Sequence, residues 1–144
     1  MNKLVEKIIK IIKETDSLDE KVSLINSIKE KLHDVSPFST EPVDCVLWVN
    51  SSNVVANDYN PNSVAPPEMK LLEHSISEDG YTQPIVTFPR IEDNKIEVVD
   101  GFHRHRVGKE SEVVSKRIKG YLPIVKIRSS QQDKENRIAS TIRH

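Results

Sequence analysis

The chain has 144 residues, 36% of them hydrophobic and 30% charged, which is enough for one domain with a short appendage. Lysine and arginine number 21 against 22 aspartates and glutamates, and the net charge of −1 excludes a uniformly basic, histone-like nucleic-acid binder. No apolar run is long enough for a transmembrane helix, and the N-terminus is too charged for a signal peptide. The single cysteine, Cys45, cannot form an internal disulfide. We therefore expect a cytoplasmic protein without a membrane partner.

Residues 1–36 are predicted to form a helical hairpin. Apolar residues recur at helical spacing over 3–14, and Ser17 precedes Glu20 by three residues, a capping-box spacing that opens a second helix. Short amphipathic helices usually bury their apolar stripe within their own protein, although the same stripe could bind a protein partner or a second copy. Both interpretations stay open. Residues 37–42, rich in proline and serine, are predicted to be a linker.

Residues 43–144 are predicted to be one domain in which strands and helices alternate. We expect strands at 43–49, 84–88, 95–99 and 121–127, helices at 66–80, 101–116 and from 129 or 130 onward, and a loop at 57–62. The turn formers at 92–94 should join two of these strands into a hairpin. The pattern predicts an α+β fold in which helices cover a small sheet.

Positive charge is concentrated in one segment. Residues 37–100 contain 3 basic and 11 acidic side chains, whereas residues 101–128 contain 8 basic and 2 acidic ones. A local basic patch on a nearly neutral protein suits a bound phosphate better than a long DNA track. The alternative is an unspecialised, solvated helix face, which would include Lys109, Lys116, Arg117 and Lys119.

The segment 98–106 (VVDGFHRHR) predicts a strand, an abrupt glycine turn and a helix that begins with cationic side chains. The N–H groups at a helix N-terminus are unpaired and carry partial positive charge, so with Arg104 and Arg106 beside them they would form a phosphate site. The alternative is that both arginines pair with acidic neighbours at the surface. Asp100 could cap the helix or take part in catalysis.

Three blocks, in order, resemble the ParB/sulfiredoxin superfamily. The segment 80–86 (GYTQPIV) is similar to the block that borders the nucleotide base in ParB proteins, and 100–106 is similar to their phosphate-binding G-x-x-R block. The segment 135–137 (ENR) is similar to a later block that helps to hold the phosphates and Mg²⁺, and Asn60-Pro61 resembles an early turn. The resemblance covers roughly residues 43–144 and implies a small mixed sheet with a ParB N-terminal-like nucleotide-binding site.

Differences between the motifs of the superfamily's branches indicate which branch this chain resembles. Sulfiredoxins have a reactive cysteine where this chain has Phe102, so their chemistry is not expected. ParB partition proteins read G-E-R-R and continue into a helix-turn-helix domain that we do not recognise here, so centromere binding is not expected. The D-G-x-H-R form is closer to ADP-dependent free-serine kinases, and closest to the prophage-coactivator, IbrB-like branch, whose basic end is similar to 137–144. That branch implies a bacterial or phage origin.

The resemblance assigns roles to individual residues. The residues expected to bind the nucleotide or its phosphates are Gln83, Pro84, Gly101, Phe102, His103, Arg104, Arg106 and Arg137. Glu135 and Asn136 would hold Mg²⁺, which prefers oxygen ligands. If phosphate is cleaved or transferred, Asp100 and His103 would be the catalytic pair. The nucleotide is CTP, ATP or ADP, and the sequence does not choose among them.

Three functions follow from the resemblance. The first is a regulatory or transcriptional co-activator domain that binds, and in one version hydrolyses, a nucleoside triphosphate with Mg²⁺. The second is a small-molecule kinase using ATP or ADP, and the third is a DNA-binding, ParB-like nuclease. The net charge of −1 argues against tight DNA binding, but the basic segment leaves room for a weak, salt-sensitive contact.

Overall fold

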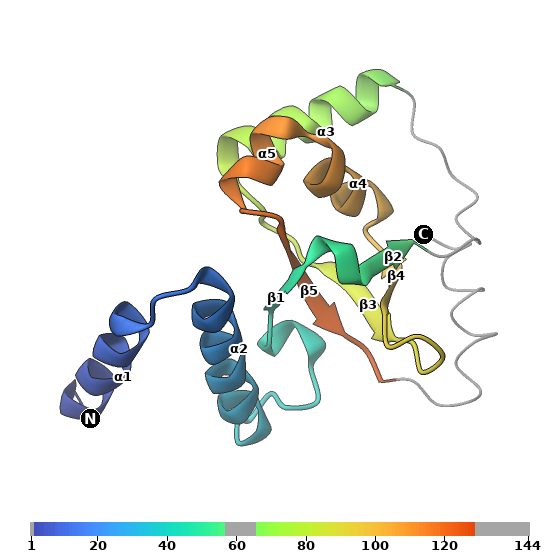
Figure 1. Ribbon diagram of the computed structural model, residues 1–144. Helices are drawn as coiled ribbons and strands as arrows, with labels where there is room; N and C mark the ends of the chain where they lie inside the picture. The colour runs from blue at the N-terminus through green and yellow to red at the C-terminus, as the bar shows by residue number, and fades with distance from the viewer. Residues whose placement is uncertain (1, 57–65, 129–144) are drawn as a thin grey trace. The chain divides into compact units, whose positions relative to one another are not determined.

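The computed structural model describes residues 2–56 and 66–128 (Figure 1). The chain forms two compact units, residues 1–47 and residues 48–144. The predicted limits of the helical arm and the linker, at residues 36 and 42, stay a prediction. None of the described helices is long and apolar enough to span a membrane.

The first unit confirms the two predicted N-terminal helices, α1 (Asn2–Glu14) and α2 (Leu18–Asp34). The predicted cap is also present, because the Ser17 hydroxyl accepts a hydrogen bond from the Glu20 N–H at 3.0 Å. Neither helix contains a buried residue. Leu4 on α1 and Leu32 on α2 are each 63% exposed, so these two apolar positions do not form a core.

The second unit is organised around a mixed five-stranded sheet. Its strands are β1 (Leu47–Asn50), β2 (Val54–Ala56), β3 (Ile85–Pro89), β4 (Ile96–Asp100) and β5 (Tyr121–Lys126), in the order β1-β5-β3-β4-β2. The expected hairpin is confirmed, since β3 and β4 pair antiparallel, while β2 runs parallel to β4 and β3 runs parallel to β5. The β-branched residues at the strand centres are buried, as their preference for a pleated surface predicts.

Three helices of this unit pack on one another: α3 (Pro66–Asp79), α4 (Phe102–Glu110) and α5 (Glu112–Arg117) (Figure 1). Each helix contributes one residue to a shared cluster, Ile76, Val107 and Val114, which are at most 5% exposed. Met69 and Leu72 of α3 also pack against the cluster. The α4 helix also contacts β3, β4 and β5 and therefore connects this cluster to the sheet.

The structure corrects two predicted elements and adds a strand that was not predicted. The strand expected at 43–49 begins only at Leu47, because the Pro42–Asp44 segment turns as a 3-10 helix, η1. The helix expected at 101–116 is broken at Ser111, whose buried hydroxyl accepts the Val114 N–H at 3.3 Å and caps α5. The short strand β2 was not predicted. The loop at 57–62, with Asn60-Pro61, and the last predicted helix lie outside the described residues.

Candidate functional site

The candidate site is built on the turn between β4 and α4. Gly101 is the N-cap residue of α4 and has φ +90°, a left-handed conformation that glycine adopts without steric cost. The Asp100 carboxylate accepts a hydrogen bond from the adjacent Gly101 N–H at 2.9 Å and does not reach the helix as a cap. The first turn of α4 therefore has no side-chain cap, which leaves its N–H groups available for an anion.

The position of α4 is fixed by a close approach at Gly108. A Cβ at Gly108 would collide with Leu122 Cδ2 of β5 and would lie 2.5 Å from the Tyr81 hydroxyl oxygen, so a larger residue would force these side chains to move. The same hydroxyl donates a hydrogen bond to the Arg104 carbonyl oxygen at 2.6 Å. Burial raises the pKa of Tyr81 to about 12, so the phenol stays protonated and remains a donor at neutral pH. Tyr81 thereby holds α4 in place below the candidate site.

Arg104 connects α4 to the residues just before β3. Its Nη1 donates to Gln83 Oε1 and its Nη2 donates to the Pro84 carbonyl oxygen, both at 3.2 Å. The structure thus brings together three residues that the sequence placed in one site. The guanidinium is half-buried, and its Nε has no hydrogen-bond partner among the described residues. In this conformation Arg104 bridges two elements of the fold.

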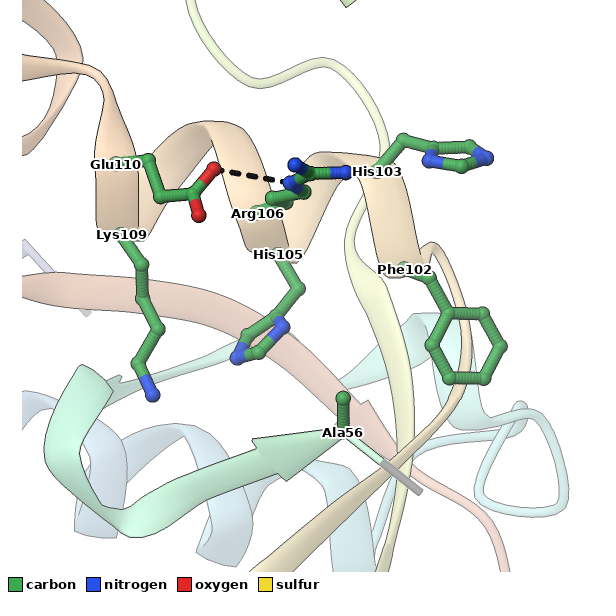
Figure 2. Close-up of a pocket in the computed structure, with 7 residues that line it drawn as sticks. All are labelled: Ala56, Phe102, His103, His105, Arg106, Lys109 and Glu110. Carbon is green, nitrogen blue, oxygen red and sulfur yellow. Dashed lines mark hydrogen bonds and ion pairs between the residues drawn. The ribbon is translucent and has the colours of Figure 1, made fainter. Parts of the chain in front are cut away.

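A pocket of about 220 Å³ lies beside the first turns of α4. Figure 2 shows its lining in the described part of the chain, which is Ala56 of β2 together with the α4 residues Phe102, His103, His105, Arg106, Lys109 and Glu110. Three of the predicted site residues, Phe102, His103 and Arg106, line this pocket. Gln83, Pro84 and Arg104 do not appear in its lining, and neither does Asp100. Among the predicted residues that the structure describes, three line the pocket, three form the Arg104 bridge, and Asp100 and Gly101 form the turn before α4.

The two cationic side chains of the pocket already have partners from their own chain. Arg106 Nε donates to Glu110 Oε2 at 2.9 Å, and Lys109 Nζ donates to the Val54 carbonyl oxygen at 3.2 Å. The Arg106 and Glu110 side chains are 53% and 65% exposed, so this ion pair is weak and easily exchanged. The geometry leaves Arg106 able to reorganise toward a bound anion.

The two histidines of the pocket favour their neutral forms. Burial lowers the pKa of His103, and the nearby Arg106 and Arg104 lower it further. Burial also lowers the pKa of His105, with a further contribution from Lys109. His105 is only 7% exposed, and its Nε2 has no hydrogen-bond partner within the described ranges. The described lining therefore carries two positive charges and one negative charge at neutral pH.

The predicted metal ligands cannot be placed. Glu135 and Asn136, with the phosphate-binding candidate Arg137, lie outside the described residues. Within residues 2–56 and 66–128, no group of three or more histidine, cysteine, aspartate or glutamate side chains could hold a metal ion. The carboxylate that does line the pocket, Glu110, was not among the predicted site residues. Its only sequence signal is its position four residues after Arg106.

The chain was compared with known proteins. No family model matches it. It is 53% identical over 126 residues to the uncharacterized protein YbdM of Escherichia coli strain K12, and the match covers 88% of this chain but only 58% of that protein.

Among solved structures, the chain resembles the C-terminally truncated chromosome-partitioning protein ParB from Caulobacter crescentus, solved in complex with CTP-γ-S. The TM-score is 0.51 at 19% identity, over 69% of this chain and 53% of the ParB chain. A Pnob8-like ParB-N domain gives a TM-score of 0.47 at 16% identity, over 65% of this chain and 33% of that one. The first likeness confirms the predicted α+β architecture, and the chain adopts a ParB-like fold.

Proposed function

We propose that the pocket beside α4 binds the phosphate groups of a nucleotide. The observation that carries this proposal is the Gly101 turn, after which Phe102 and His103 of the uncapped first turn of α4 line the same pocket as Arg106 and Lys109. Unpaired N–H groups and cationic side chains together are a recurrent phosphate-binding arrangement. The neutral histidines add hydrogen-bonding groups without adding charge.

The ligand class is inferred from the fold. Caulobacter ParB is solved with CTP-γ-S, and we propose CTP, ATP or ADP as the ligand of this chain. Phe102 lines the pocket and would offer an aromatic face to the base or ribose. Gln83 and Pro84 remain proposed as a wall for the base, and Arg104 as a phosphate ligand, provided that Arg104 leaves its present partners when the nucleotide binds.

The remaining parts of the site are proposed from the sequence resemblance. Mg²⁺ would be held by Glu135 and Asn136, and Arg137 would add a phosphate contact. If the nucleotide is hydrolysed or its phosphate transferred, Asp100 and His103 would act, with His103 facing the pocket. The biological role that we propose is that of a regulatory or co-activator protein of the IbrB-like branch. The kinase and nuclease alternatives, dimerisation through α1 and α2 and a cytoplasmic location stay predictions.

The proposal is tested by thermal unfolding with CTP, ATP, ADP and GTP, each with and without Mg²⁺. A ligand at 100 times its dissociation constant should stabilise the folded state by about 2.7 kcal/mol. Arg106→Ala should weaken the effective nucleotide by about tenfold or more, because one charge-assisted hydrogen bond is lost. Lys116→Ala is the matched control, since Lys116 pairs with Glu112 on α5 and does not line the pocket.

Two outcomes would contradict the proposal. The first is that no nucleotide changes the melting temperature of the wild-type chain. The second is that a nucleotide binds but Arg106→Ala and Lys116→Ala bind it equally well, which would move the ligand away from this pocket.

A further inference from the structure

A carboxylate lines the pocket that we propose for an anion. Glu110 lies one helical turn after Arg106, and its Oε2 accepts a hydrogen bond from Arg106 Nε at 2.9 Å. Figure 2 shows the two side chains turned toward each other along α4, with His105 and Lys109 extending from the helix toward β2. The arginine of the described pocket lining, which we propose as a phosphate ligand, is therefore paired with a negative group of the same chain.

This arrangement disfavours a bare anion in two ways. A phosphate that binds Arg106 must displace the Glu110 carboxylate from the Nε hydrogen bond, and afterwards it still faces that negative charge. A terminal phosphate carries about −1.5 to −2 charge near pH 7, so the repulsion is substantial. Both side chains are more than half exposed, which means that water and salt reduce the repulsion without removing it.

A divalent cation on the phosphates reverses the sign of this interaction. The cation cancels two negative charges of the ligand and presents a positive centre to the carboxylate. Carboxylate oxygens are ligands that Mg²⁺ favours, directly or through a water molecule. Once Glu110 leaves Arg106 for the cation, the guanidinium becomes free to bind phosphate. The same carboxylate that opposes the bare polyphosphate would thus assist its metal complex.

Building on the proposed phosphate-binding function, we propose that Glu110 makes the pocket selective for a polyphosphate that carries a divalent cation over the same polyphosphate without one. Glu110 is the carboxylate of the pocket lining in the described part of the chain. It belongs to the same helix as Arg106, which packs closely against Leu122 of β5 and Tyr81 at Gly108, so the backbone positions of the two residues are set by the fold. Glu110 is then a specificity-determining residue and not a catalytic one.

The chain offers a matched control two residues further on. Glu112 lies in the first turn of α5, its side chain is 81% exposed, and it pairs with Lys116 at 3.1 Å. Glu112 lines a different groove, between α3 and α5, together with residues such as Lys70 and His74. Glu112→Gln therefore removes the same charge from a neighbouring position without touching the pocket. Both glutamates are exposed, so neither glutamine variant should lose the fold.

The experiment is isothermal titration calorimetry of the full chain with inorganic tripolyphosphate, with and without Mg²⁺, at constant ionic strength. The wild-type chain should bind the Mg²⁺ complex more tightly than the free polyphosphate. In Glu110→Gln the affinity for free tripolyphosphate should rise by about three- to tenfold, because a nearby repulsive charge is removed. The affinity for the Mg²⁺ complex should stay the same or fall, so the preference for Mg²⁺ shrinks. Glu112→Gln should behave as the wild type does.

The outcomes separate this inference from the function on which it rests. If the wild-type chain binds neither form of tripolyphosphate, the phosphate site is wrong and the inference fails with it. If the wild type binds but Glu110→Gln keeps the full preference for Mg²⁺, only the role of Glu110 is overturned. An equal loss of preference in Glu110→Gln and Glu112→Gln would also overturn that role, because it would show a general charge effect.

Discussion

Arg104 Nη2 lies 2.7 Å from the point at which a Cβ on Gly101 would stand. The left-handed turn and the arginine bridge therefore depend on each other. A Cβ at Gly101 would meet the guanidinium that lies across the turn and reaches Pro84, so Arg104 would have to shift. The turn at Gly101, which the sequence suggested as a phosphate site, thus also packs against the Arg104 side chain.

Gly101→Ala should lower the free energy of unfolding by more than Gly120→Ala does. Both glycines have positive φ, +90° and +81°, so both substitutions introduce backbone strain of about 1–2 kcal/mol. Only Gly101 also contacts Arg104, whereas a Cβ at Gly120 would meet nothing within 4 Å. Displacing the Arg104 hydrogen bonds should add about 1 kcal/mol or more. Equal losses in urea-induced unfolding would show that the arginine moves aside freely.

Arg104→Ala should lower the free energy of unfolding by more than Arg106→Ala does. Arg104→Ala should destabilise the chain by about 1–3 kcal/mol, because it leaves the Pro84 carbonyl and Gln83 without their partner. Arg106→Ala removes only an exposed i,i+4 ion pair and should cost less than about 0.5 kcal/mol. Chemical denaturation of both variants checks this order. A stability loss in Arg106→Ala that matches the loss in Arg104→Ala would refute it.

Acidification should destabilise the fold through His105. Its pKa is lowered below 6.5 by burial, so between its folded and unfolded pKa values the unfolded chain binds more protons. The stabilisation is therefore complete above pH 6.5 and is lost as the pH falls through the folded-state pKa. His105→Asn, which keeps a polar group in the same place but does not titrate, should show a flatter dependence of unfolding free energy on pH from 7.5 to 5.

The matched control for this pH dependence is His103→Asn. The pKa of His103 is lowered in the same direction, but the side chain is less buried, so its substitution should flatten the curve less. The role of His105 would be refuted by a wild-type pH profile that persists in His105→Asn.

Arg117→Ala should destabilise α3 even though it lies on α5. Its Nη1 and Nη2 donate to the Ser77 and Ile76 carbonyl oxygens, at 2.6 and 2.7 Å, and thereby satisfy acceptors at the C-terminal end of α3. The expected loss is about 1–3 kcal/mol, measured by thermal unfolding. Lys116→Ala, which breaks only an exposed pair with Glu112, should be close to neutral.

The sequence predicted those elements of the fold that depend on residues close together in the chain. The Ser17 cap, the helix predicted at 66–80 and the turn between β3 and β4 each depend on residues close together in the sequence, and the structure contains all three. The break at Ser111 was missed because Val107 and Val114 keep the helical spacing of a single helix across it. A serine followed by a glutamate was the available signal for a new helix N-terminus.

Only part of the candidate site was predicted, because contacts between residues far apart in the sequence decide which side chains face the pocket. Arg104 and Arg106 are two residues apart on one helix, so they point in different directions, and sequence alone does not say which one faces a pocket. That choice is made by Pro84 and Gln83, about 20 residues earlier in the chain. His105 and Lys109 share a face of α4, and that face is directed toward Val54 of β2. Since β2 was not predicted, neither residue could be assigned to the site.

The pairing of β2 with β4 places Ala56, on one side of the pocket, in the same sheet as the strand that leads into α4. Ala56 lies opposite Val98 in a parallel ladder, and β4 continues two residues beyond Val98 to the Gly101 turn. β2 is therefore linked to the start of α4 through its hydrogen-bonded pairing with β4 and the Gly101 turn. Ala56 contributes only a methyl group to the pocket lining, so a larger side chain at this position would reduce the space open to a ligand.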